Sequence, residues 1–424
     1  MIDLNQLKEK ELQLRQAILS KRIDLDFDRL LFLTEHVERQ KLQVDLLRQT
    51  RNTLSEQIAK NTGTRNELVE KSKLNNKDLV EAETVLRNYE NERQGLEAML
   101  PGIPHAAVPQ GETDADNTER HKWGTPKPPD LTPRDHLQLA EMHGLVEFEA
   151  ARAMSGSRAY ALVGDGALLE MAVMRFAFDH ILAKGFQAIL PPLMVRTEAM
   201  FGTGYFPFGE ENAYELTKDG LYLTGTSEVG IVALHAGKTI DLADLPKRMV
   251  GISTCFRREA GSAGRDTRGL YRMHQFQKVE QVVFCEADPA LAQEQHDLLL
   301  QNAEEILQAL ELPYRVMECC SGELGLGQTR KYDIETWMPG RTNYGETHSC
   351  SNFEDFQARR LNIRYRDESG KKKLVYTLNN TAIASPRILI ALLENHQDLQ
   401  GRIYIPPVLR PYLTGRTHLE TAST

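Results

Sequence analysis

The segment from Phe256 to Glu280 reads FRREAGSAGRDTRGLYRMHQFQKVE and holds the densest group of chemically active side chains in the sequence. The runs on either side, Lys247–Phe256 and His274–Cys285, are rich in β-branched and aromatic residues, which predicts two strands joined by a polar, glycine-rich loop. Other strand patterns follow without a regular alternation with helices, and no GxGxxG or Walker sequence is present. We therefore expect an α+β fold in which helices pack on an antiparallel sheet.

These two strands would bring unlike polar groups onto one surface. Because side chains alternate along a strand, Arg257 and Glu259 would share a face of the first strand, and Phe276 and Glu280 a face of the second. Arginine is suited to two-point capture of phosphate or carboxylate, an aromatic ring can stack on a nucleobase, and carboxylates can orient polar ligand groups. Taken alone, the pattern indicates either such a binding surface or a surface hairpin held by ion pairs.

Two further segments carry oxygen-bearing side chains. Leu223–Gly230 (LTGTSEVG) would place Thr226 and Glu228 on one face of an apolar strand. Tyr344–Asn352 (YGETHSCSN) contains the consecutive residues Glu346, Thr347, His348 and Ser349. Carboxylate and hydroxyl oxygens suit Mg²⁺, especially when phosphates complete its coordination shell. Zinc is not expected, because no second ligand pair with suitable spacing accompanies the His348 and Cys350 side chains.

Two helices are predicted in the same half of the chain. Leu374–Gln397 (LVYTLNNTAIASPRILIALLENHQ) predicts a strand that runs into an amphipathic helix with Arg387 at its start. An arginine at a helix N-terminus meets an unfavourable dipole, so its placement there favours a role in bridging to an anion. Residues Leu168–Lys184 are apolar almost all round, which predicts a helix buried in a core or an interface.

The N-terminal part has a different pattern, with heptad-like apolar spacing from about Leu30 to Leu100. The first series is Leu30, Leu33, Val37, Gln40, Val44, Leu47, Arg51, Leu54 and Ile58. The second is Leu68, Ser72, Asn75, Leu79, Ala82, Leu86, Tyr89, Arg93, Leu96 and Leu100. Because a turn signal, residues 61–64 (NTGT), separates the two series, they predict an antiparallel coiled-coil hairpin.

Charge is distributed unevenly along this hairpin. Residues 39–77 hold nine basic and four acidic residues, a net of +5, whereas residues 78–97 hold two basic and six acidic residues, a net of −4. A charge run is usually a solvated helix face, but a basic tip can also lie along an RNA backbone and displace its counterions. The candidate RNA contacts are Arg48, Arg51, Lys60, Arg65, Lys71 and Lys73.

Composition bounds the class of protein. The 424 residues are 41% hydrophobic and 26% charged, which excludes a disordered, fibrous or membrane-embedded chain, and the net charge of −9 excludes a uniformly basic nucleic-acid coat. The five cysteines fit reduced thiols, and the charged N-terminus lacks a signal core, so we expect a cytoplasmic protein that does not enter a membrane. The proline-rich stretch 101–133 marks a boundary, which predicts domains at 1–110 and 111–424.

The order of these motifs resembles the bacterial-type seryl-tRNA synthetases, which are class II aminoacyl-tRNA synthetases. The matching segments are TSE, the whole of Phe256–Glu280, ETHSCS and LNNTAIASPRILIALLENHQ, together with the long N-terminal hairpin. The helix from Leu168 followed by FQAILPPLM resembles the first class II motif. The resemblance implies a coiled-coil arm that binds tRNA, a class II catalytic domain and a homodimer formed through the first motif. It also implies two steps, in which serine and ATP give seryl-adenylate and the seryl group then moves to tRNA(Ser), and to tRNA(Sec) as well.

The resemblance further implies a role for each motif residue. The ATP contacts would be Arg257, Arg258, Glu259, Phe276, Glu346, Thr347, His348, Ser349 and Arg387. The serine contacts would be Thr226, Ser227, Glu228, Arg257, Glu280, Asn379 and Thr381. Glu346 and Ser349 would carry Mg²⁺ or Mn²⁺, and no zinc is implied. Arg257 and Arg387 would be the catalytic pair, the first on the α-phosphate and the serine carboxylate, the second on the γ-phosphate.

One residue departs from the family pattern, and three rival interpretations remain. Asn380 takes a place that glycine often holds in the family, whereas the hydroxyl of Thr381 is kept. A paralogue that loads a carrier protein would lack the long arm, which is present here. A catalytically dead RNA-binding protein would have lost Arg257, Glu280 or Arg387. A purely structural coiled-coil protein would leave the remaining, roughly 300-residue part of the chain unexplained.

Overall fold

The computed structural model describes residues 4–60, 65–126, 133–260 and 269–419. The chain divides into two compact units, Met1–Ile103 and Pro104–Thr424. The predicted turn at 61–64 and most of the predicted glycine-rich loop, residues 261–268, lie outside the described residues. The domain ranges 1–110 and 111–424 stay a prediction.

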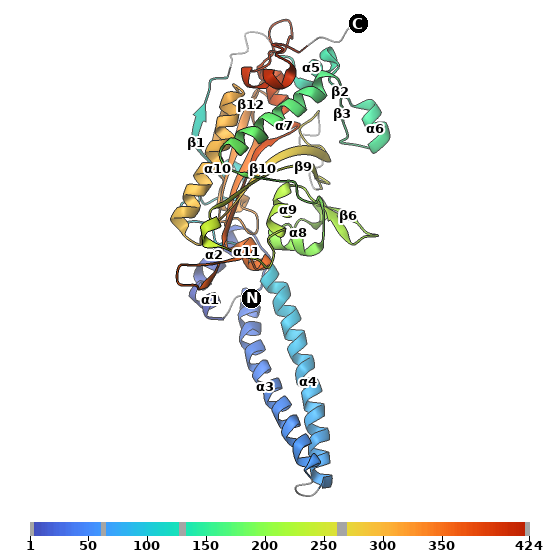
Figure 1. The fold of residues 1–424 in the computed structure, drawn as a ribbon, viewed down its shortest axis with the longest axis vertical. Coiled ribbons are helices and arrows are strands. Elements are labelled where there is room, and N and C mark those ends of the chain that lie inside the picture. The colour runs from blue at the N-terminus through green and yellow to red at the C-terminus, as the bar shows by residue number, and fades with distance from the viewer. Residues whose placement is uncertain (1–3, 61–64, 127–132, 261–268, 420–424) are drawn as a thin grey trace. The chain divides into compact units, whose positions relative to one another are not determined.

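The first unit is helical. Its helices are α1 (Leu4–Glu9), α2 (Glu11–Ser20), α3 (Phe27–Ala59) and α4 (Arg65–Ala98). The long helices α3 and α4 pack side by side as the predicted hairpin (Figure 1). The buried seam contains Leu30, Leu33, Val37, Val44, Leu54, Asn75, Leu79, Ala82 and Arg93. Arg51 was predicted in this seam, but it is exposed, because its long charged side chain remains in water.

Polar residues in the seam bond across the hairpin to backbone carbonyls. The Asn75 amide donates to the carbonyl of Leu47 at 3.1 Å, and the Gln40 amide donates to the carbonyl of Ala82 at 3.2 Å. A polar group at such a position satisfies its hydrogen bonds in only one alignment of the two helices, so these contacts favour a single register.

The second unit is built on an eight-stranded sheet. In sheet order the strands are β1 (Thr118–Trp123), β11 (Tyr314–Glu318), β12 (Arg330–Met338), β13 (Asn343–Glu354), β16 (Tyr376–Ala384), β10 (Gln275–Cys285), β9 (Lys247–Phe256) and β4 (Gln187–Ile189). All neighbours pair antiparallel except β4 and β9. The α+β prediction is confirmed, and the two strands predicted around the glycine-rich loop are β9 and β10.

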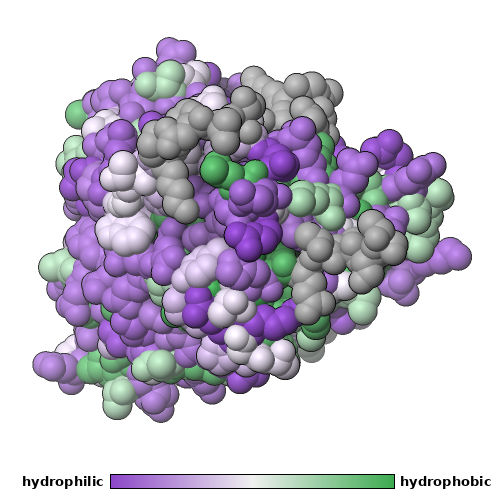
Figure 2. Space-filling view, turned by 90° about the horizontal axis from the view of Figure 1, so that it is seen from above, coloured by the Kyte–Doolittle hydropathy of each residue, from purple (hydrophilic) through white to green (hydrophobic). Residues whose placement is uncertain are grey.

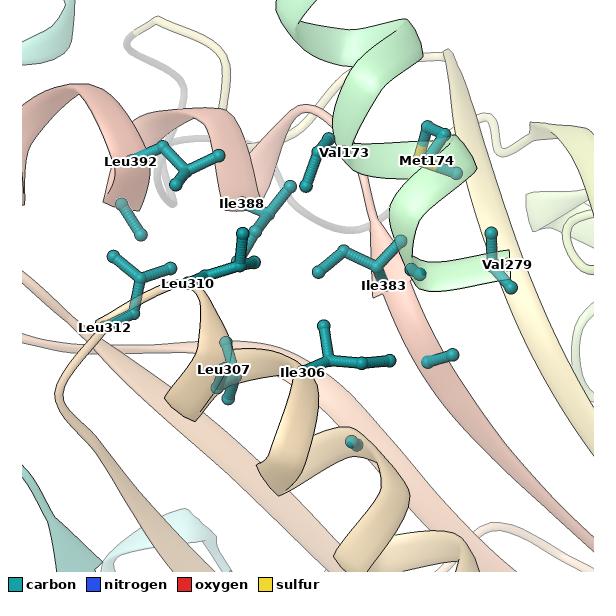
Figure 3. Close-up of a cluster of buried hydrophobic side chains, with 14 of the residues drawn as sticks. Val173, Met174, Val279, Ile306, Leu307, Leu310, Leu312, Ile383, Ile388 and Leu392 are labelled. Carbon is teal, nitrogen blue, oxygen red and sulfur yellow. The ribbon is translucent and has the colours of Figure 1, made fainter. Parts of the chain in front are cut away.

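Helices α7 (Asp165–Ala183), α10 (Pro289–Ala309) and α12 (Arg387–Asn395) enclose the main core against this sheet. Figure 3 shows side chains from all three helices meeting residues of β10 and β16. Helix α7 was predicted to be buried in a core or an interface. One of its faces enters the main core. Leu168 and Met171, on the other face, keep 47% and 69% of their surface exposed.

The opposite face of the sheet carries shorter elements. These include α8 (Thr197–Thr203), α9 (Ser227–Ala233), α11 (Phe356–Leu361), the sheet β5 (Met194–Val195), β7 (Leu221–Leu223) and β6 (Tyr214–Leu216), and the sheet β15 (Lys372–Leu374), β14 (Arg364–Arg366) and β8 (Thr239–Ile240). The peripheral elements are α5 (His136–His143), β2 (Val146–Glu147), α6 (Glu149–Ser155) and β3 (Ala161–Leu162). On this face Val282 and Phe284 of β10 pack with Ile231 and Val232 of α9 in a second core. The odd-numbered Val279 and Val283 belong to the main core, so the alternation along β10 separates the two faces.

The surface shown in Figure 2 is mostly hydrophilic, with hydrophobic residues in small separate groups. Among the described residues, no helix combines the length and apolar character that crossing a membrane requires. All five cysteines are free and buried.

Candidate active site

A cavity of about 340 Å³ lies on the sheet face that carries α8, α9 and α11. All of its lining residues fall between 203 and 387, inside the second unit. Residues predicted for the site that line it are Glu228, Arg257, Glu259, Phe276, Glu280, Glu346, Thr347, His348, Ser349, Asn379, Thr381 and Arg387. Thr226, Ser227 and Arg258 do not line it.

Strand β10 supplies three successive side chains of one face to the cavity. Phe276, Lys278 and Glu280 all line it, as the alternation of a strand requires. The Lys278 ammonium forms an ion pair with the Glu280 carboxylate, and the Thr381 hydroxyl donates to the same carboxylate at 3.4 Å. Burial raises the pKa of Glu280, although the charge of Lys278 opposes the rise. The buried Glu280 carboxylate is therefore already paired with a positive charge of the protein itself.

Glu228 provides a second carboxylate from a helix. The predicted apolar strand through Thr226 and Glu228 is wrong, because the chain turns into α9 at Ser227. Thr226 caps this helix, and its hydroxyl accepts a hydrogen bond from the Glu228 amide at 3.2 Å. Both Thr226 and Ser227 are buried beneath the site. They start the helix that carries Glu228, and their predicted contact with serine stays a prediction.

The Glu228 carboxylate is held by two neighbours. The Gln357 amide donates to it at 2.7 Å, and the Tyr205 hydroxyl donates at 3.5 Å. Burial raises the pKa of Glu228 to about 7, and the nearby Glu280 carboxylate adds to the rise. Two carboxylates in one enclosed space disfavour each other's ionised form. The cavity is therefore suited to a ligand with a positive group at Glu228.

Arg257 and Glu259 come just after β9 rather than on it, which corrects their predicted place on that strand. The strand ends at Phe256, and Glu259 has the left-handed backbone angle φ 54°. The Arg257 Nε donates to the carbonyl of Gly225 at 3.3 Å, and its guanidinium lies 5.3 Å from the centre of the Phe276 ring. Arg272 donates to the Glu259 carboxylate at 3.1 Å. Both predicted side chains therefore reach the cavity from a turn.

A bulge in β13 brings Glu346 and Ser349 to the cavity together. His348 pairs with Ile334 and Glu346 with Glu335, so Thr347 is an extra residue in this strand. Without the bulge, two residues three positions apart would face opposite sides of the sheet. The bulge therefore lets both oxygen-bearing side chains face one ligand.

The four residues of this segment differ in how free their polar groups are. The Thr347 hydroxyl lies 2.7 Å from that of Thr336, and the His348 ring lies 2.8 Å from Thr347 and 3.1 Å from the carbonyl of Ala382. Burial lowers the pKa of His348 to about 4, so the ring is neutral near pH 7. The side chain of Glu346, by contrast, is 45% exposed. Glu346 and Ser349 therefore offer the oxygens that a ligand can reach.

Arg387 is the first residue of α12 and already meets an anion. Its guanidinium donates to the backbone carbonyl of Glu346 at 2.9 Å and lies 3.3 Å from the Glu346 carboxylate. Burial raises the pKa of Glu346, but the charges of Arg387, Lys331 and Arg257 outweigh burial and hold that pKa below its usual value. In the structure this arginine is thus paired with a carboxylate of the protein itself. Its predicted contact with a phosphate stays a prediction.

Several residues of the site were missed at the sequence level. Lys278 could have been found, because it stands between Phe276 and Glu280 on the same strand face. Tyr205 and Gln357 could not, because they reach Glu228 from distant segments that no local pattern connects. Among the described residues, no cluster of three or more His, Cys, Asp or Glu side chains could hold a metal ion.

The candidate RNA contacts all lie on α3 and α4 or directly after α3, and they differ in their partners. Arg48 pairs with Glu83 at 2.8 Å, Lys60 with Glu56 at 3.9 Å and Lys73 with Glu70 at 2.8 Å. Arg51, Arg65 and Lys71 are exposed and form no ion pair within the part of the chain that the structure describes. The charges of these three residues are the ones most open to a polyanion.

Comparison with family models gives two matches. A model described as the seryl-tRNA synthetase N-terminal domain matches residues 1–104. A model described as the tRNA synthetase class II core domain (G, H, P, S and T) matches residues 212–396.

Whole-chain relatives agree with these models. A serine–tRNA ligase of Deinococcus radiodurans is 45% identical and aligns over 98% of each chain, and one of Caldanaerobacter subterraneus subsp. tengcongensis is 43% identical over 97% of this chain and 98% of its own. Among solved structures, the seryl-tRNA synthetase of Pyrococcus horikoshii complexed with ATP matches with a TM-score of 0.91 at 36% identity, covering 100% of both chains. The cytoplasmic serine–tRNA ligase of Naegleria fowleri in complex with AMP matches with a TM-score of 0.88 at 27% identity, covering 100% of this chain and 99% of its own.

Proposed function

We propose a role in substrate binding or catalysis for the residues of the cavity. The premise is that the chain belongs to the seryl-tRNA synthetase family. It is a class II aminoacyl-tRNA synthetase that activates serine with ATP and transfers the seryl group to tRNA. The observation that carries the proposal is the composition of a single cavity. Two buried carboxylates, Glu228 and Glu280, line it together with Arg257, Arg387 and the Phe276 ring. A zwitterionic amino acid and a nucleoside triphosphate would satisfy these groups together.

Serine would bind between the two carboxylates. Its ammonium group would meet Glu228, which has no ion pair within the described residues and is held by Gln357 and Tyr205. Its hydroxyl would donate to Glu280 and meet the Thr381 hydroxyl, with the Asn379 amide nearby. An amino acid without a hydroxyl would bury Glu280 without this additional donor, which makes such an amino acid a poor ligand.

ATP would bind along the part lined by arginine and phenylalanine. The Phe276 ring would stack on the adenine, and Glu259 would accept from its amino group. Arg257 would contact the α-phosphate and the serine carboxylate, and Arg387 would hold the γ-phosphate. Thr347 and His348 would shape the floor beneath the phosphates, since their polar atoms are already bonded within the protein.

A Mg²⁺ or Mn²⁺ ion bound with ATP fits Glu346 and Ser349. The low pKa of Glu346 keeps its carboxylate ionised, and both side chains line the cavity from one strand. When bound, the ion would neutralise phosphate charge. Glu346 and Ser349 would hold this ion, and Arg387, which lies beside Glu346, would contact phosphate.

The chemistry would need positioning and charge stabilisation but no protein nucleophile. A serine carboxylate oxygen attacks the α-phosphorus, the bond to the pyrophosphate oxygen breaks, and pyrophosphate leaves. Arg257 faces the charge that grows during this displacement. In the second step a hydroxyl of the terminal adenosine of tRNA attacks the seryl carbonyl carbon, and AMP leaves.

Three further features complete the proposal. The basic residues of α3 and α4 would bind tRNA(Ser), and tRNA(Sec) as well. A homodimer would form through the exposed apolar face of α7 at Leu168 and Met171, which an interface would cover. A cytoplasmic location is proposed because the buried, free cysteines suit a reducing compartment.

The test is ATP–pyrophosphate exchange with each of the twenty amino acids, followed by charging of serine tRNA. Exchange should depend on serine, and charging should follow with the same amino acid. Exchange driven by another amino acid would overturn the serine assignment. Serine exchange followed by loading of a carrier protein instead of tRNA would overturn the choice of acceptor.

A further inference from the structure

The ring of Tyr271 carries two guanidinium groups beside the cavity. The central carbon of Arg387 lies 4.5 Å from the ring centre, and that of Arg341 also lies 4.5 Å from it. Arg387 begins α12, and Arg341 ends the short helical turn Pro339–Arg341. Tyr271 itself is only 9% exposed and lines the cavity. None of the roles proposed above involves this tyrosine.

Two hydrogen bonds of Tyr271 also join it to the Arg387 guanidinium and to β13. The Tyr271 carbonyl accepts from Arg387 Nε at 3.2 Å, and the Tyr271 hydroxyl donates to the Glu346 carbonyl at 3.4 Å. The same Glu346 carbonyl accepts from Arg387 at 2.9 Å. Tyrosine and arginine are therefore joined at three points: the ring, the tyrosine backbone and a shared acceptor.

Packing fixes the ring in this place. Tyr271 belongs to a small core with Leu270, Met338 and Ile390. At Gly345 a Cβ atom would lie 3.2 Å from the ring edge and 3.0 Å from the Met338 sulfur, so the bare backbone there makes room for the ring. A buried, tightly packed ring has little freedom to turn away from the guanidinium groups on it.

The position of Arg387 explains why such support matters. A cation at a helix N-terminus faces the positive end of the dipole, so it needs a compensating negative potential. The face of an aromatic ring supplies one without a formal charge that would repel phosphate. The Glu346 carboxylate also compensates this charge, and it is one of the two groups proposed above to hold the metal ion.

We infer that Tyr271 is a positioning residue that holds the Arg387 guanidinium toward the terminal phosphate of ATP. The inference rests on the role proposed above for Arg387. It assigns to the tyrosine a selective effect on nucleotides that carry β- and γ-phosphates, because AMP lacks the phosphate that Arg387 would contact.

The experiment measures Kd for ATP and for AMP by calorimetric titration of the full chain with excess Mg²⁺. Tyr271→Leu should raise the Kd for ATP by about 5- to 30-fold, the range expected for losing a desolvated cation–π contact, and should leave the Kd for AMP unchanged. Tyr271→Phe keeps the ring and its size and should retain most of the ATP affinity. If Tyr271→Leu does not fold, Tyr271→Met fills the same core space without a ring and makes the same comparison.

Two controls separate the possible failures. Tyr404→Leu removes a matched pair outside the cavity, where Arg410 lies 5.1 Å from the Tyr404 ring, and should change neither Kd. Arg387→Ala should itself weaken ATP selectively, and if it does not, the proposed role of Arg387 fails. If Arg387→Ala weakens ATP while Tyr271→Leu leaves it unchanged, or weakens ATP and AMP equally, Arg387 keeps its role and the positioning role of Tyr271 is overturned.

Discussion

At the scale of single residues, the cavity holds two buried carboxylates but, within the described residues, only one ammonium group that is paired with either of them. Glu228 and Glu280 are both buried, and burial raises the pKa of each carboxylate. Lys278 supplies one resident positive charge through its ion pair with Glu280. The ammonium group of an amino acid would supply the second. The pocket is therefore electrically complete only when its ligand is present.

Removing the resident charge should damage serine activation. In Lys278→Met the buried Glu280 would lose the charge that favours its ionised form, so it would accept the serine hydroxyl less well as a carboxylate. Breaking a buried ion pair commonly costs about 3–5 kcal/mol, so kcat/KM for serine should fall by about 100-fold or more while KM for ATP changes little. Lys278→Arg should recover part of the loss. Pyrophosphate exchange measures both constants, and an unchanged kcat/KM for serine in Lys278→Met would contradict the argument.

Glu280 should decide that the substrate carries a hydroxyl. A site that hydrogen-bonds a substrate hydroxyl rejects an analogue lacking it by about 10⁴-fold or more, so the wild-type enzyme should refuse alanine although it fits. In Glu280→Gln and Glu280→Ala the preference for serine over alanine should collapse, chiefly through loss of serine activation. Exchange assays with both amino acids test this. Soluble variants that keep the wild-type preference would leave Glu280 as a brace for Lys278 only.

Serine binding should depend on pH through Glu228. The pKa of this group is about 7 in the free protein, and only its ionised form attracts the serine ammonium. As the pH falls below 7, the protonated fraction grows, so KM for serine should rise by up to about tenfold per pH unit, while KM for ATP should not follow. In Glu228→Gln the KM for serine should be high at every pH. A KM for serine that stays flat between pH 5.5 and 8 in the wild-type enzyme would exclude this role.

At the scale of elements, strand β16 shows how one strand serves two environments. Asn379 and Thr381 line the cavity, whereas Asn380 between them points to the other face and is fully buried. Its amide donates to the carbonyl of Leu299 in α10 at 2.6 Å, and the neighbouring Gln281 donates to the same carbonyl at 3.3 Å. The residue that departs from the family pattern therefore ties the strand to a helix behind the sheet.

Replacing Asn380 should affect stability and spare the substrate site. Asn380→Ala removes one short hydrogen bond, but it also removes Oδ1, which has no hydrogen-bond partner among the described residues. The net loss should be about 1 kcal/mol, or about 2–4 °C in Tm, with KM for serine unchanged. Thermal unfolding and pyrophosphate exchange measure the two quantities. A rise in KM for serine would show that the back of the strand also shapes the pocket.

The same scale shows what sequence patterns can and cannot predict. The strands β9 and β10 and the coiled-coil seam were predictable, because period-two and heptad patterns are local and strong. The short helix α9 was wrongly predicted as a strand, because its few apolar residues fit either structure. The hydrogen bond that the Thr226 side chain accepts at the start of the segment favours the helix. The bulge at Thr347 was not predictable, because its extra residue is defined only by pairing with β12. Most motif residues predicted for the site therefore line one cavity, whereas the turns, the bulge and the neighbouring side chains that orient them were not predicted.

At the scale of the whole molecule, the chemistry and the basic helices belong to different units. Every residue that lines the cavity lies in Pro104–Thr424, and every candidate RNA contact lies in Met1–Ile103. The first unit has its own apolar core around Leu7, Phe27 and Leu30, which does not involve the outer part of the hairpin. The outer hairpin can therefore be removed while both cores remain.

Replacing residues 39–77 by a short Gly-Ser turn should leave serine-dependent pyrophosphate exchange nearly intact and abolish tRNA charging. The removed segment carries a net charge of +5. Its basic side chains would release counterions from the RNA backbone, and the deletion removes this favourable contribution to tRNA binding. A milder variant, Arg51→Gln with Arg65→Gln and Lys71→Gln, should raise KM for tRNA and flatten its dependence on salt. The matched control neutralises two exposed lysines of the second unit, Lys371→Gln with Lys372→Gln, and should charge tRNA normally. Exchange without charging in the deletion variant would assign the hairpin to RNA binding. Equal loss of exchange and charging would instead show that the hairpin supports the fold of the catalytic unit.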